Sequence, residues 1–381
     1  MYSSLKNNQK KILFYVIISF LCVPIVQQKG QFISIKPLHG SFHNMDPISI
    51  SFKNWFNGTY PKHTEKYLNE NFGFRSFFVR IYNQLQYSLF KKAKANGVII
   101  GKENYLYEEN YILAYLGRDF IGEEKIIQKV EKLKKISDTL SSKSIEIIIL
   151  LAPGKGSFYP EYIPEKYSPT NFNKTNYEVY KNFILQEGLH LLDFQSWFLQ
   201  MKRNSKHPLF PKTGIHWSKY GEFLVADSII NYINYRTSKN VCSKILLTKM
   251  NESNNPLDTD DDIENGMNLL FNIKDLKMGY PEFQFELSRD TSKSKVLVVA
   301  DSYYWGLFNS GISRDIFNNG EFWFYNKQIY PQSYTAPLNV EDINLNDHIE
   351  SNDVIILLST DANLSKFAFG FIDEAYDLYF N

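Results

Sequence analysis

The sequence predicts an α/β fold in which a mostly parallel sheet is flanked by helices. The first observation is a set of four short apolar runs separated by polar or helix-like segments: 145–151, 295–299, 321–325 and 354–358. Apolar runs of this length are typical of strands that are buried on both faces. The second observation is that amphipathic segments alternate with these runs, which is the chain order expected for parallel strands connected by helices.

Size and composition are those of a globular protein. The chain has 381 residues, of which 44% are hydrophobic and 22% charged, enough for one large or two modest domains. The formal net charge of +1 gives no electrostatic reason to expect a nucleic-acid partner. Aromatic residues make up 16%, which suits either a core rich in rings or a groove that binds sugar faces. Cys22 lies in the apolar N-terminal segment, so Cys242 has no partner for a disulfide.

The N-terminus resembles a membrane-targeting segment. Lys6, Lys10 and Lys11 precede the apolar run Ile12–Val26, whose length lies between that of a signal-peptide core and a full membrane span. No small-x-small cleavage site follows this run. We therefore predict an uncleaved signal-anchor over residues 1–28, a single pass through the cell membrane with the C-terminal domain exported to the periplasmic side. A cleaved signal peptide and a buried helix are the alternatives.

The remaining elements can be taken in chain order. Residues 29–50 contain glycine and proline but no apolar period, which predicts a connector ahead of one α/β domain over 51–381. A stripe of apolar residues at a spacing of four predicts a helix that ends near Phe90, and Asn96-Gly97 predicts a turn before two short strands. Further periodicity predicts these elements: helix 123–140, helix 177–186, strand 190–194, helix 195–202 and helix 218–233, the last with Ser218 as its N-cap.

Residues 251–265 (N-E-S-N-N-P-L-D-T-D-D-D-I-E-N) form an acidic stretch without hydrophobic periodicity. We interpret this stretch as a surface loop. Alternating aspartates also suggest a calcium loop, but the glycine and the closing glutamate of such a loop are not at the required positions. Cysteines and histidines do not cluster at metal-ligand spacing elsewhere, so we expect no metal and no organic cofactor.

A serine and a histidine are the best candidates for a nucleophilic site. Ligand sites of open α/β sheets lie beyond the carboxyl ends of the strands. Ser302 follows the apolar run 295–299 at a strand-to-helix turn, where its hydroxyl can project and a nearby backbone N–H can face an oxyanion. Because a serine hydroxyl is a weak nucleophile without a base, such a site also needs a general base, commonly a histidine. His216, beside Trp217 at the start of a predicted helix, has the most suggestive surroundings of the seven histidines.

Five motifs in this order resemble one family: residues 55–75, G-K-E-N-Y-L-Y (101–107), A-P-G-K-G-S-F-Y-P-E (152–161), H-W-S-K-Y-G (216–221) and V-V-A-D-S-Y (298–303). The chain is similar, from about residue 50 to 370, to the AlgJ/AlgX-like (DHHW-type) relatives of the SGNH hydrolases. Those are exported O-acetyltransferases of bacterial exopolysaccharide systems. The resemblance implies an SGNH-like sheet with a circularly rearranged order, because the histidine precedes the serine.

The resemblance implies roles for individual residues. Ser302 matches the nucleophile and His216 the base, while Asp301 matches the aspartate of the family's Gly-Asp-Ser, with Ala300 in place of the glycine. The family's orienting acid, two residues before the histidine, is replaced by Gly214, so no acid can be transferred. His216 could work without one, use a backbone carbonyl, or borrow a carboxylate from these candidates: Asp193, Asp301 or Asp361.

Residues near the same loops are candidates for substrate or oxyanion contacts: Lys155, Trp217, Tyr303 and Asn363. The resemblance implies acetyl transfer onto an exopolysaccharide or cell-surface glycan through an acyl-serine. It also implies a multi-span membrane acyltransferase that supplies the acetyl group, and no cofactor. Two alternatives stay open: a glycan acetylesterase with the same site, and a polysaccharide-binding scaffold weakened by the loss of the acid at position 214.

Overall fold

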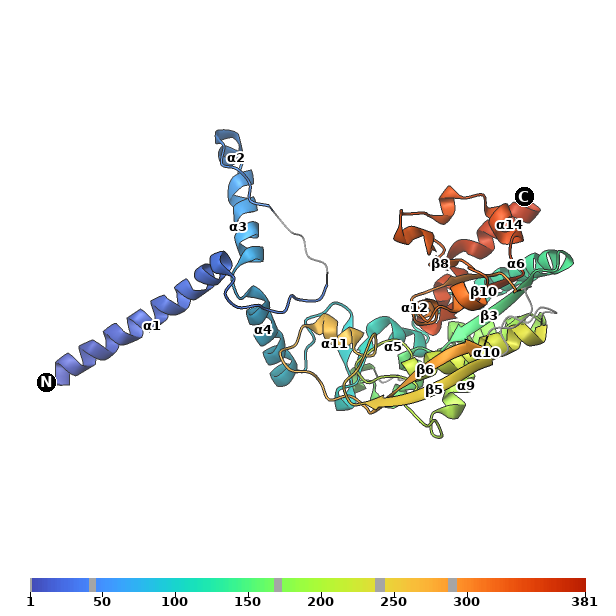
Figure 1. Cartoon of the computed structure of the whole chain (residues 1–381), viewed down its shortest axis with the longest axis horizontal. Coiled ribbons are helices and arrows are strands. Elements are labelled where there is room, and N and C mark those ends of the chain that lie inside the picture. Colours follow the sequence, from blue (N-terminus) through green and yellow to red (C-terminus); the bar gives the residue numbers. More distant parts are fainter. Residues whose placement is uncertain (1, 41–45, 168–172, 237–243, 287–292) are drawn as a thin grey trace. The chain divides into compact units, whose positions relative to one another are not determined.

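A six-stranded sheet, in the order β4-β3-β10-β7-β8-β9, is the centre of the larger part of the chain (Figure 1). The computed structural model describes residues 2–40, 46–167, 173–236, 244–286 and 293–381, so Cys242 lies outside the described residues. The strands are β3 (Glu146–Ala152), β4 (His190–Asp193), β7 (Val296–Ala300), β8 (Phe322–Phe324), β9 (Gln328–Tyr330) and β10 (Val354–Thr360).

The sheet is parallel except at one edge. Strand β10 lies between β3 and β7 and runs parallel to both, and all seven of its residues are buried. Strand β9 is antiparallel to β8. The predicted mostly parallel sheet with doubly buried strands is therefore confirmed. Because the strands are parallel, the loops after β3, β7, β8 and β10 leave from the same edge.

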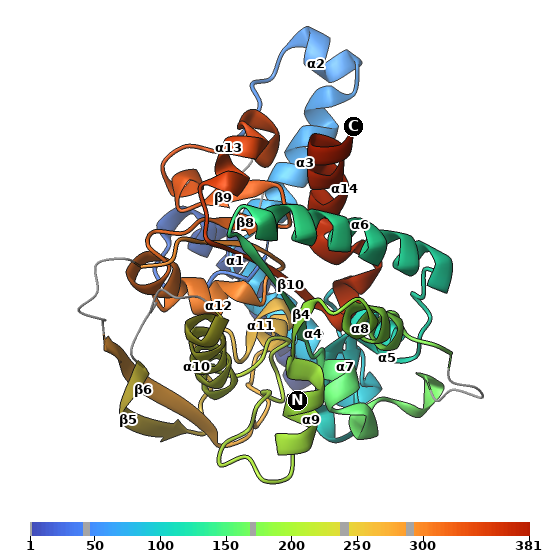
Figure 2. The same ribbon diagram turned by 90° about the vertical axis from the view of Figure 1, so that its right-hand side faces the viewer.

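Helices cover both faces of the sheet. Helices α6 (Glu123–Ser142), α8 (Asn176–Gln186) and α14 (Phe371–Phe380) contribute to a core cluster on one face. Helices α9 (Phe194–Met201) and α10 (Lys219–Arg236) lie on the other, and Figure 2 shows α6 and α10 on opposite sides of β10. Five apolar residues of the period that predicts α6 are each at most 1% exposed: Ile126, Val130, Leu133, Ile136 and Leu140. At roughly 1.5–3 kcal/mol per buried side chain, packing rather than helix propensity stabilises this helix.

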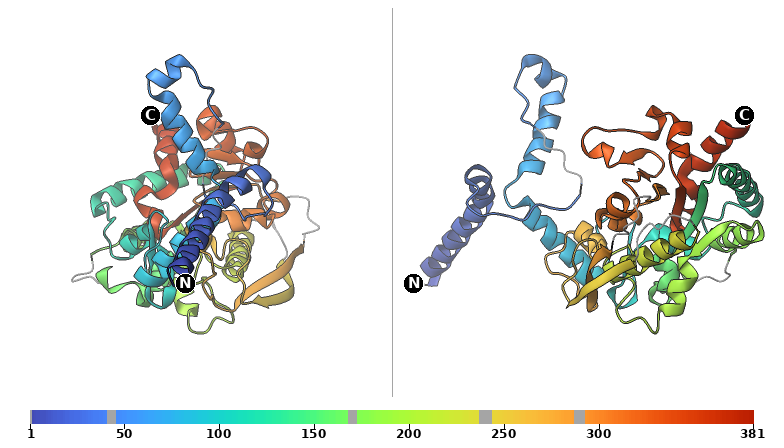
Figure 3. Two further views of the ribbon diagram at one scale, coloured as in Figure 1. Left: turned by 90° about the vertical axis from the view of Figure 1, so that its left-hand side faces the viewer. Right: turned by 45° about the vertical axis from the view of Figure 1, so that its right-hand side comes forward.

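A β-hairpin that the sequence patterns did not predict lies along α10 (Figure 3). Strands β5 (Lys244–Ser253) and β6 (Met278–Glu286) pair in antiparallel fashion with one register shift. The prediction of a surface loop over 251–265 is therefore wrong at both ends, because β5 includes its first residues and helix α11 (Asp262–Met267) its last.

The shorter elements are α5 (Glu109–Tyr115), α7 (Lys155–Phe158), α12 (Tyr304–Asn309), α13 (Leu345–Glu350), β1 (Val98–Ile100) and β2 (Leu106–Glu108).

The chain divides into two compact units. One comprises residues 1–96 with 264–272, and the other, which contains the sheet, comprises 97–263 with 273–381. The α/β unit thus begins at Gly97 rather than at residue 51. Helices α2 (Phe52–Phe56), α3 (Thr59–Asn71) and α4 (Arg75–Phe90) belong to the first unit. Within it, the buried Asn83 of α4 donates to the carbonyl of Met267, a polar contact that apolar periodicity cannot reveal.

The first unit begins with helix α1 (Tyr2–Gly30). Its segment Asn8–Gly30 is long and apolar enough to cross a membrane by length and composition. A signal sequence near the N-terminus meets the same criterion, so the uncleaved anchor and its topology stay predictions.

Candidate active site

Ser302 lies where β7 ends and the chain turns into α12. This turn is fixed by its neighbour Asp301, whose Oδ1 accepts a hydrogen bond from the backbone N–H of Tyr303 at 3.1 Å. Ser302 is half-buried, so its hydroxyl stays at the carboxyl edge of the sheet rather than in the core. This is the position that the sequence predicts for the nucleophile.

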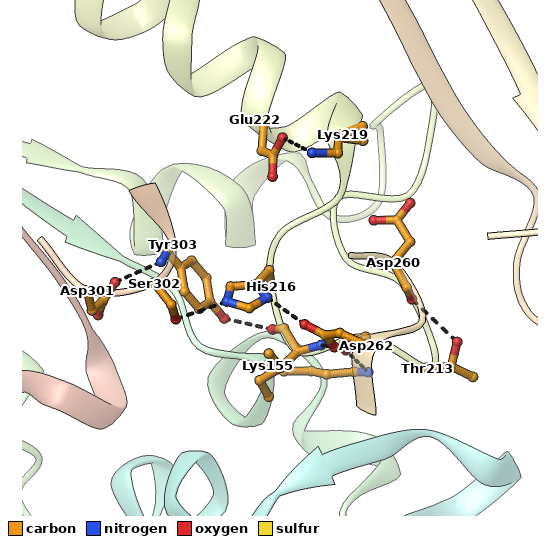
Figure 4. A network of polar contacts seen from close by, with 12 residues as sticks. Lys155, Thr213, His216, Lys219, Glu222, Asp260, Asp262, Asp301, Ser302 and Tyr303 are labelled. Atoms are coloured by element: carbon orange, nitrogen blue, oxygen red, sulfur yellow. Dashed lines mark hydrogen bonds and ion pairs between the residues drawn. The ribbon is translucent and has the colours of Figure 1, made fainter. Parts of the chain in front are cut away.

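His216 meets this serine. Its Nε2 lies 3.0 Å from Ser302 Oγ, within hydrogen-bond distance (Figure 4). The segment before α10 that carries His216 is held by Tyr303, whose hydroxyl donates to the carbonyl of Ile215 at 2.8 Å. The Tyr303 ring also packs on the imidazole, with 5.0 Å between ring centroids. The structure thus brings together the predicted pair.

Asp262, at the start of α11, supplies the missing acid. Its Oδ2 lies 2.7 Å from His216 Nδ1, and its Oδ1 accepts a hydrogen bond from the backbone N–H of Ile215 at 2.9 Å. Figure 4 shows Ser302, His216 and Asp262 in a row joined by these contacts. An aspartate on Nδ1 fixes the tautomer in which Nε2 can accept the serine proton and stabilises the imidazolium that forms. The residues therefore form a Ser-His-Asp triad.

Gly214 is explained by the same segment. A Cβ added at Gly214 would lie 2.6 Å from the carbonyl oxygen of Asp260 and 2.7 Å from that of Thr259. The backbone of Thr259 and Asp260, which leads to Asp262, therefore occupies the space where a side chain at position 214 would begin. An aspartate at position 214 and this course of residues 259–262 exclude each other.

None of the three acids considered from the sequence contacts His216. Asp193 caps α9 by accepting from the N–H of Ser196 at 3.0 Å and pairs with Lys181 at 2.7 Å. Asp361 accepts a short hydrogen bond from Ser157, and burial raises its pKa to about 7. The predictions that Asp193, Asp301 or Asp361 orients the histidine are therefore wrong, because each carboxylate is bound elsewhere.

Asp301 ties the nucleophile turn to the loop after β10. Besides Tyr303, its fully buried carboxylate accepts from the backbone N–H and the hydroxyl of Thr360, both at 2.8 Å, and from Asn363 Nδ2 at 2.9 Å. A carboxylate with four donors is well compensated for its burial. Asp301 therefore holds Asn363 beside Ser302, where the predicted hydrogen bond of Asn363 to substrate stays a prediction.

Lys155 is a buried support and not a substrate contact. Its side chain is fully buried, and Nζ donates to the carbonyls of Lys212 and Gly214 at 2.7 and 2.6 Å. Burial disfavours the ammonium and lowers the pKa of Lys155 to about 7, although carboxylates including Asp275 and Asp262 oppose this shift. The prediction that Lys155 binds substrate is wrong, because the group fixes the backbone that leads to His216.

Two aromatic candidates are also buried. Tyr303 is 1% exposed and Trp217 is 0% exposed, so the prediction that they contact substrate is wrong. Both support the histidine segment from within the core, with 5.1 Å between their ring centroids. The aromatic residue next to the nucleophile is instead Tyr325, after β8, whose hydroxyl faces Ser302 and Asn363. No motif in the sequence pointed to it.

The electrostatics of the triad give a testable pH dependence. Burial disfavours the charged imidazolium, but the hydrogen bond and charge of Asp262 outweigh it, so the pKa of His216 is raised. Because a general base must be neutral, activity falls as pH drops through this pKa. The acid limb of kcat/KM for acetyl-ester cleavage is therefore expected above about 6.5, the ordinary value for histidine. A limb at or below that value, in initial rates measured from pH 5 to 9, would contradict the assignment of His216.

Among the residues that the structure describes, no group of three or more His, Cys, Asp or Glu side chains is arranged to hold a metal ion.

Comparisons with known proteins agree with this architecture. Residues 98–254 match the family model described as the SGNH hydrolase-like domain of the acetyltransferase AlgX, a span that includes His216 but not Asp262 or Ser302. The "Probable alginate O-acetylase AlgJ" of Azotobacter vinelandii is 25% identical over 171 residues, 44% of this chain and 42% of that protein. The protein of the same name from Pseudomonas fluorescens is 21% identical over 184 residues, 48% of this chain and 45% of that protein. The chain thus spans less than half of the length of these relatives.

Two solved structures align with most of this chain at low identity. The O-acetyltransferase domain of Pseudomonas putida AlgJ aligns with 74% of this chain and 99% of its own, at 16% identity and a TM-score of 0.46. Bacillus cereus PatB1 with a sulfonyl adduct aligns with 73% of this chain and 99% of its own, at 14% identity and a TM-score of 0.47. The family model and the curated relatives confirm the resemblance drawn from the motifs, and the chain has an SGNH hydrolase-like α/β fold.

Proposed function

We propose that this SGNH hydrolase-like chain of the AlgJ/AlgX type transfers acetyl groups onto hydroxyls of an exopolysaccharide or cell-surface glycan through an acyl-serine. The observation that carries the proposal is the row of contacts Ser302–His216–Asp262, at 3.0 and 2.7 Å. A triad of this geometry performs acyl transfer on unrelated folds, and here it stands in a fold whose curated relatives are named as O-acetylases.

The first half-reaction would acylate the serine. His216 Nε2 takes the proton of Ser302 while Oγ attacks the acetyl carbonyl, and Asp262 stabilises the imidazolium. Backbone N–H groups at the nucleophile turn, with Asn363, would donate to the oxyanion. When the tetrahedral intermediate collapses, the bond from carbon to the leaving oxygen breaks, and His216 returns the proton to that oxygen.

The second half-reaction would use the same groups on a sugar. His216 takes the proton of a glycan hydroxyl, the resulting oxygen attacks the acetyl carbon, and Ser302 leaves with the proton. The apolar helix Asn8–Gly30 would anchor the exported α/β unit beside a multi-span membrane acyltransferase that supplies acetyl groups. The scaffold alternative loses its motivation, since Asp262 takes the place of the acid that Gly214 cannot provide. If water replaced the sugar hydroxyl as the acceptor, the same site would release free acetate.

The proposal is tested by incubating the full chain in detergent with a small acetyl ester and an oligosaccharide acceptor. We expect acetylated oligosaccharide from the wild type and a loss of about 10³-fold or more for Ser302→Ala, because the nucleophile is gone. Mass spectrometry of the acceptor measures transfer, and free acetate measures hydrolysis. Acetate without transfer would identify an esterase, and product formed equally by Ser302→Ala would refute the acyl-serine.

A further inference from the structure

Helix α4 exposes its apolar stripe and buries polar residues. Spacings of four, three and four place four apolar or aromatic residues in one line along the helix, and each is at least 49% exposed: Phe78, Tyr82, Leu85 and Leu89. The residues that α4 buries are Arg80, Asn83 and Tyr87. A surface helix of a soluble domain normally has the opposite arrangement, with its apolar stripe against the core. An exposed stripe of this kind indicates a surface that binds an apolar partner.

Hydrogen bonds fix which side of α4 faces inward. Arg80 Nη2 donates to the carbonyl of Pro37 at 2.7 Å, and Asn83 Nδ2 donates to the carbonyl of Met267 at 2.9 Å. Both acceptors belong to the same compact unit as α4. A rotation of the helix that buried Leu85 would leave these polar groups without their partners, which is unfavourable for buried donors. The stripe is therefore held facing outward.

Helix α1 ends against the turn between α3 and α4. Within the apolar run Ile12–Val26 only Pro24 is buried. A Cβ added at Gly73, in this turn, would overlap the carbonyl oxygen of Pro24 and lie 2.9 Å from the backbone nitrogen of Gln28. Figure 1 shows the end of α1 beside the turn. Because this contact lies at the C-terminal end of the apolar run, a span in the predicted orientation places the turn at the exported surface of the bilayer.

The turn itself adds aromatic rings to the exposed surface. Phe72 and Phe77 are each at least 41% exposed, and their ring centroids lie 6.3 and 6.0 Å from that of Phe78, the first residue of the stripe. Apolar faces that combine phenylalanine and leucine are typical of helices that lie in the interface of a membrane. The exposed surface thus begins where the predicted span leaves the bilayer.

We propose that the stripe of α4, together with Phe72 and Phe77, inserts into the exported interface of the lipid bilayer. This inference is independent of the acetyl chemistry, and it takes its orientation from the predicted span. At the usual depth of roughly 5–10 Å for an interfacial helix, Phe78 and Leu85 contact the upper parts of the acyl chains. The chain then has a second membrane attachment besides α1, and this attachment restricts rotation of the first unit about the axis of α1.

The depth of the stripe can be measured in the full chain. The chain is reconstituted in nanodiscs of zwitterionic phospholipid, with Cys22 and Cys242 replaced by alanine and a fluorophore on Leu85→Cys or Leu89→Cys. We expect nitroxides near the headgroup end of the acyl chains to quench either label at least about twofold more than nitroxides near the chain end, because the helix lies in the interface. Aqueous iodide should quench a label on Tyr334→Cys, which is 63% exposed in the α/β unit, and spare both stripe labels.

Two other results would overturn the proposal. Stripe labels that iodide quenches and lipid nitroxides do not would show that the stripe faces water. Stripe labels that neither quencher reaches would show that protein covers the stripe, either a second copy or another part of the chain.

A charged variant tests whether the stripe itself makes the contact. Leu85→Glu is expected to lower lipid quenching of the label at Leu89→Cys by at least about half, because a carboxylate is costly in the acyl region. Gln86→Glu is the matched control, since it adds the same charge to the neighbouring residue outside the stripe and should leave the quenching unchanged. Circular dichroism in detergent checks that both variants keep their helices. Quenching that is equal in the two folded variants would refute the insertion of α4.

Discussion

Asp262→Asn is expected to lower kcat/KM for acetyl transfer by about 10⁴-fold while the chain still folds. Asparagine keeps the shape of the side chain but loses the negative charge, and its amide can donate to His216 Nδ1 and so favour the wrong tautomer. In known Ser-His-Asp enzymes the corresponding change lowers kcat by about 10⁴-fold. Initial rates with the small acetyl ester and the oligosaccharide acceptor measure the loss.

Two further variants make this result specific. Asp258→Asn is the matched control, because it removes a carboxylate from the same segment whose side chain is 65% exposed, and it should leave the rate within about twofold. Adding Gly214→Asp to Asp262→Asn should restore nothing, since the new Cβ would meet the carbonyl oxygen of Asp260 at 2.6 Å. Full activity of Asp262→Asn, or rescue by Gly214→Asp, would show that another group orients His216.

Asp301→Ala is expected to reduce the free energy of unfolding by about 3–5 kcal/mol. The change leaves the donors on Tyr303, Thr360 and Asn363 without their buried acceptor. Each buried donor without a partner costs roughly 1–3 kcal/mol, and part of that cost is recovered when water enters the space. Urea unfolding of the chain in detergent, followed by tryptophan fluorescence, measures the difference.

Asp193→Ala is the comparison for this variant. Asp193 also accepts several hydrogen bonds, but it stands at the partly exposed start of α9, so its loss should cost only about 1 kcal/mol. Equal destabilisation by the two variants would show that the buried hydrogen bonds of Asp301 contribute no more to the free energy of unfolding than the partly exposed ones of Asp193. Asp301→Ala should also reduce acetyl transfer, because Asn363 and the turn at Ser302 lose their common support.

The sheet and two of the three triad residues could be predicted because their signals are local. A doubly buried strand such as β10 is recognisable from continuous Ile and Leu, and Ser302 from its place after such a strand. Asp262 carries no local signal. It stands in a run of acidic residues that resembles solvated loop, and only the hairpin of β5 and β6 brings one member of that run to His216. Long-range pairing of this kind leaves no period in the sequence.

Buried polar groups were missed for a related reason. Lys155 follows a strand at the edge where substrates bind, so its position suggested a substrate contact. Its actual partners, the carbonyls of Lys212 and Gly214, are backbone groups about 60 residues away. Because every residue has such a carbonyl, the residue types in the sequence do not show which ones accept from Lys155. The start of the α/β unit at Gly97 escaped notice likewise, since helix α4 has the apolar stripe of a core helix whichever unit it joins.

The glycine at position 214 also bears on how related chains are sorted. A search that requires an aspartate two residues before the histidine would discard this chain as inactive, although its histidine holds an aspartate at 2.7 Å. The acid of such a triad can come from another segment, provided that the residue at the usual acid position is small enough for the backbone of that segment to pass. A small residue at the position where an acid is expected is therefore a reason to look for a replacement carboxylate elsewhere in the chain.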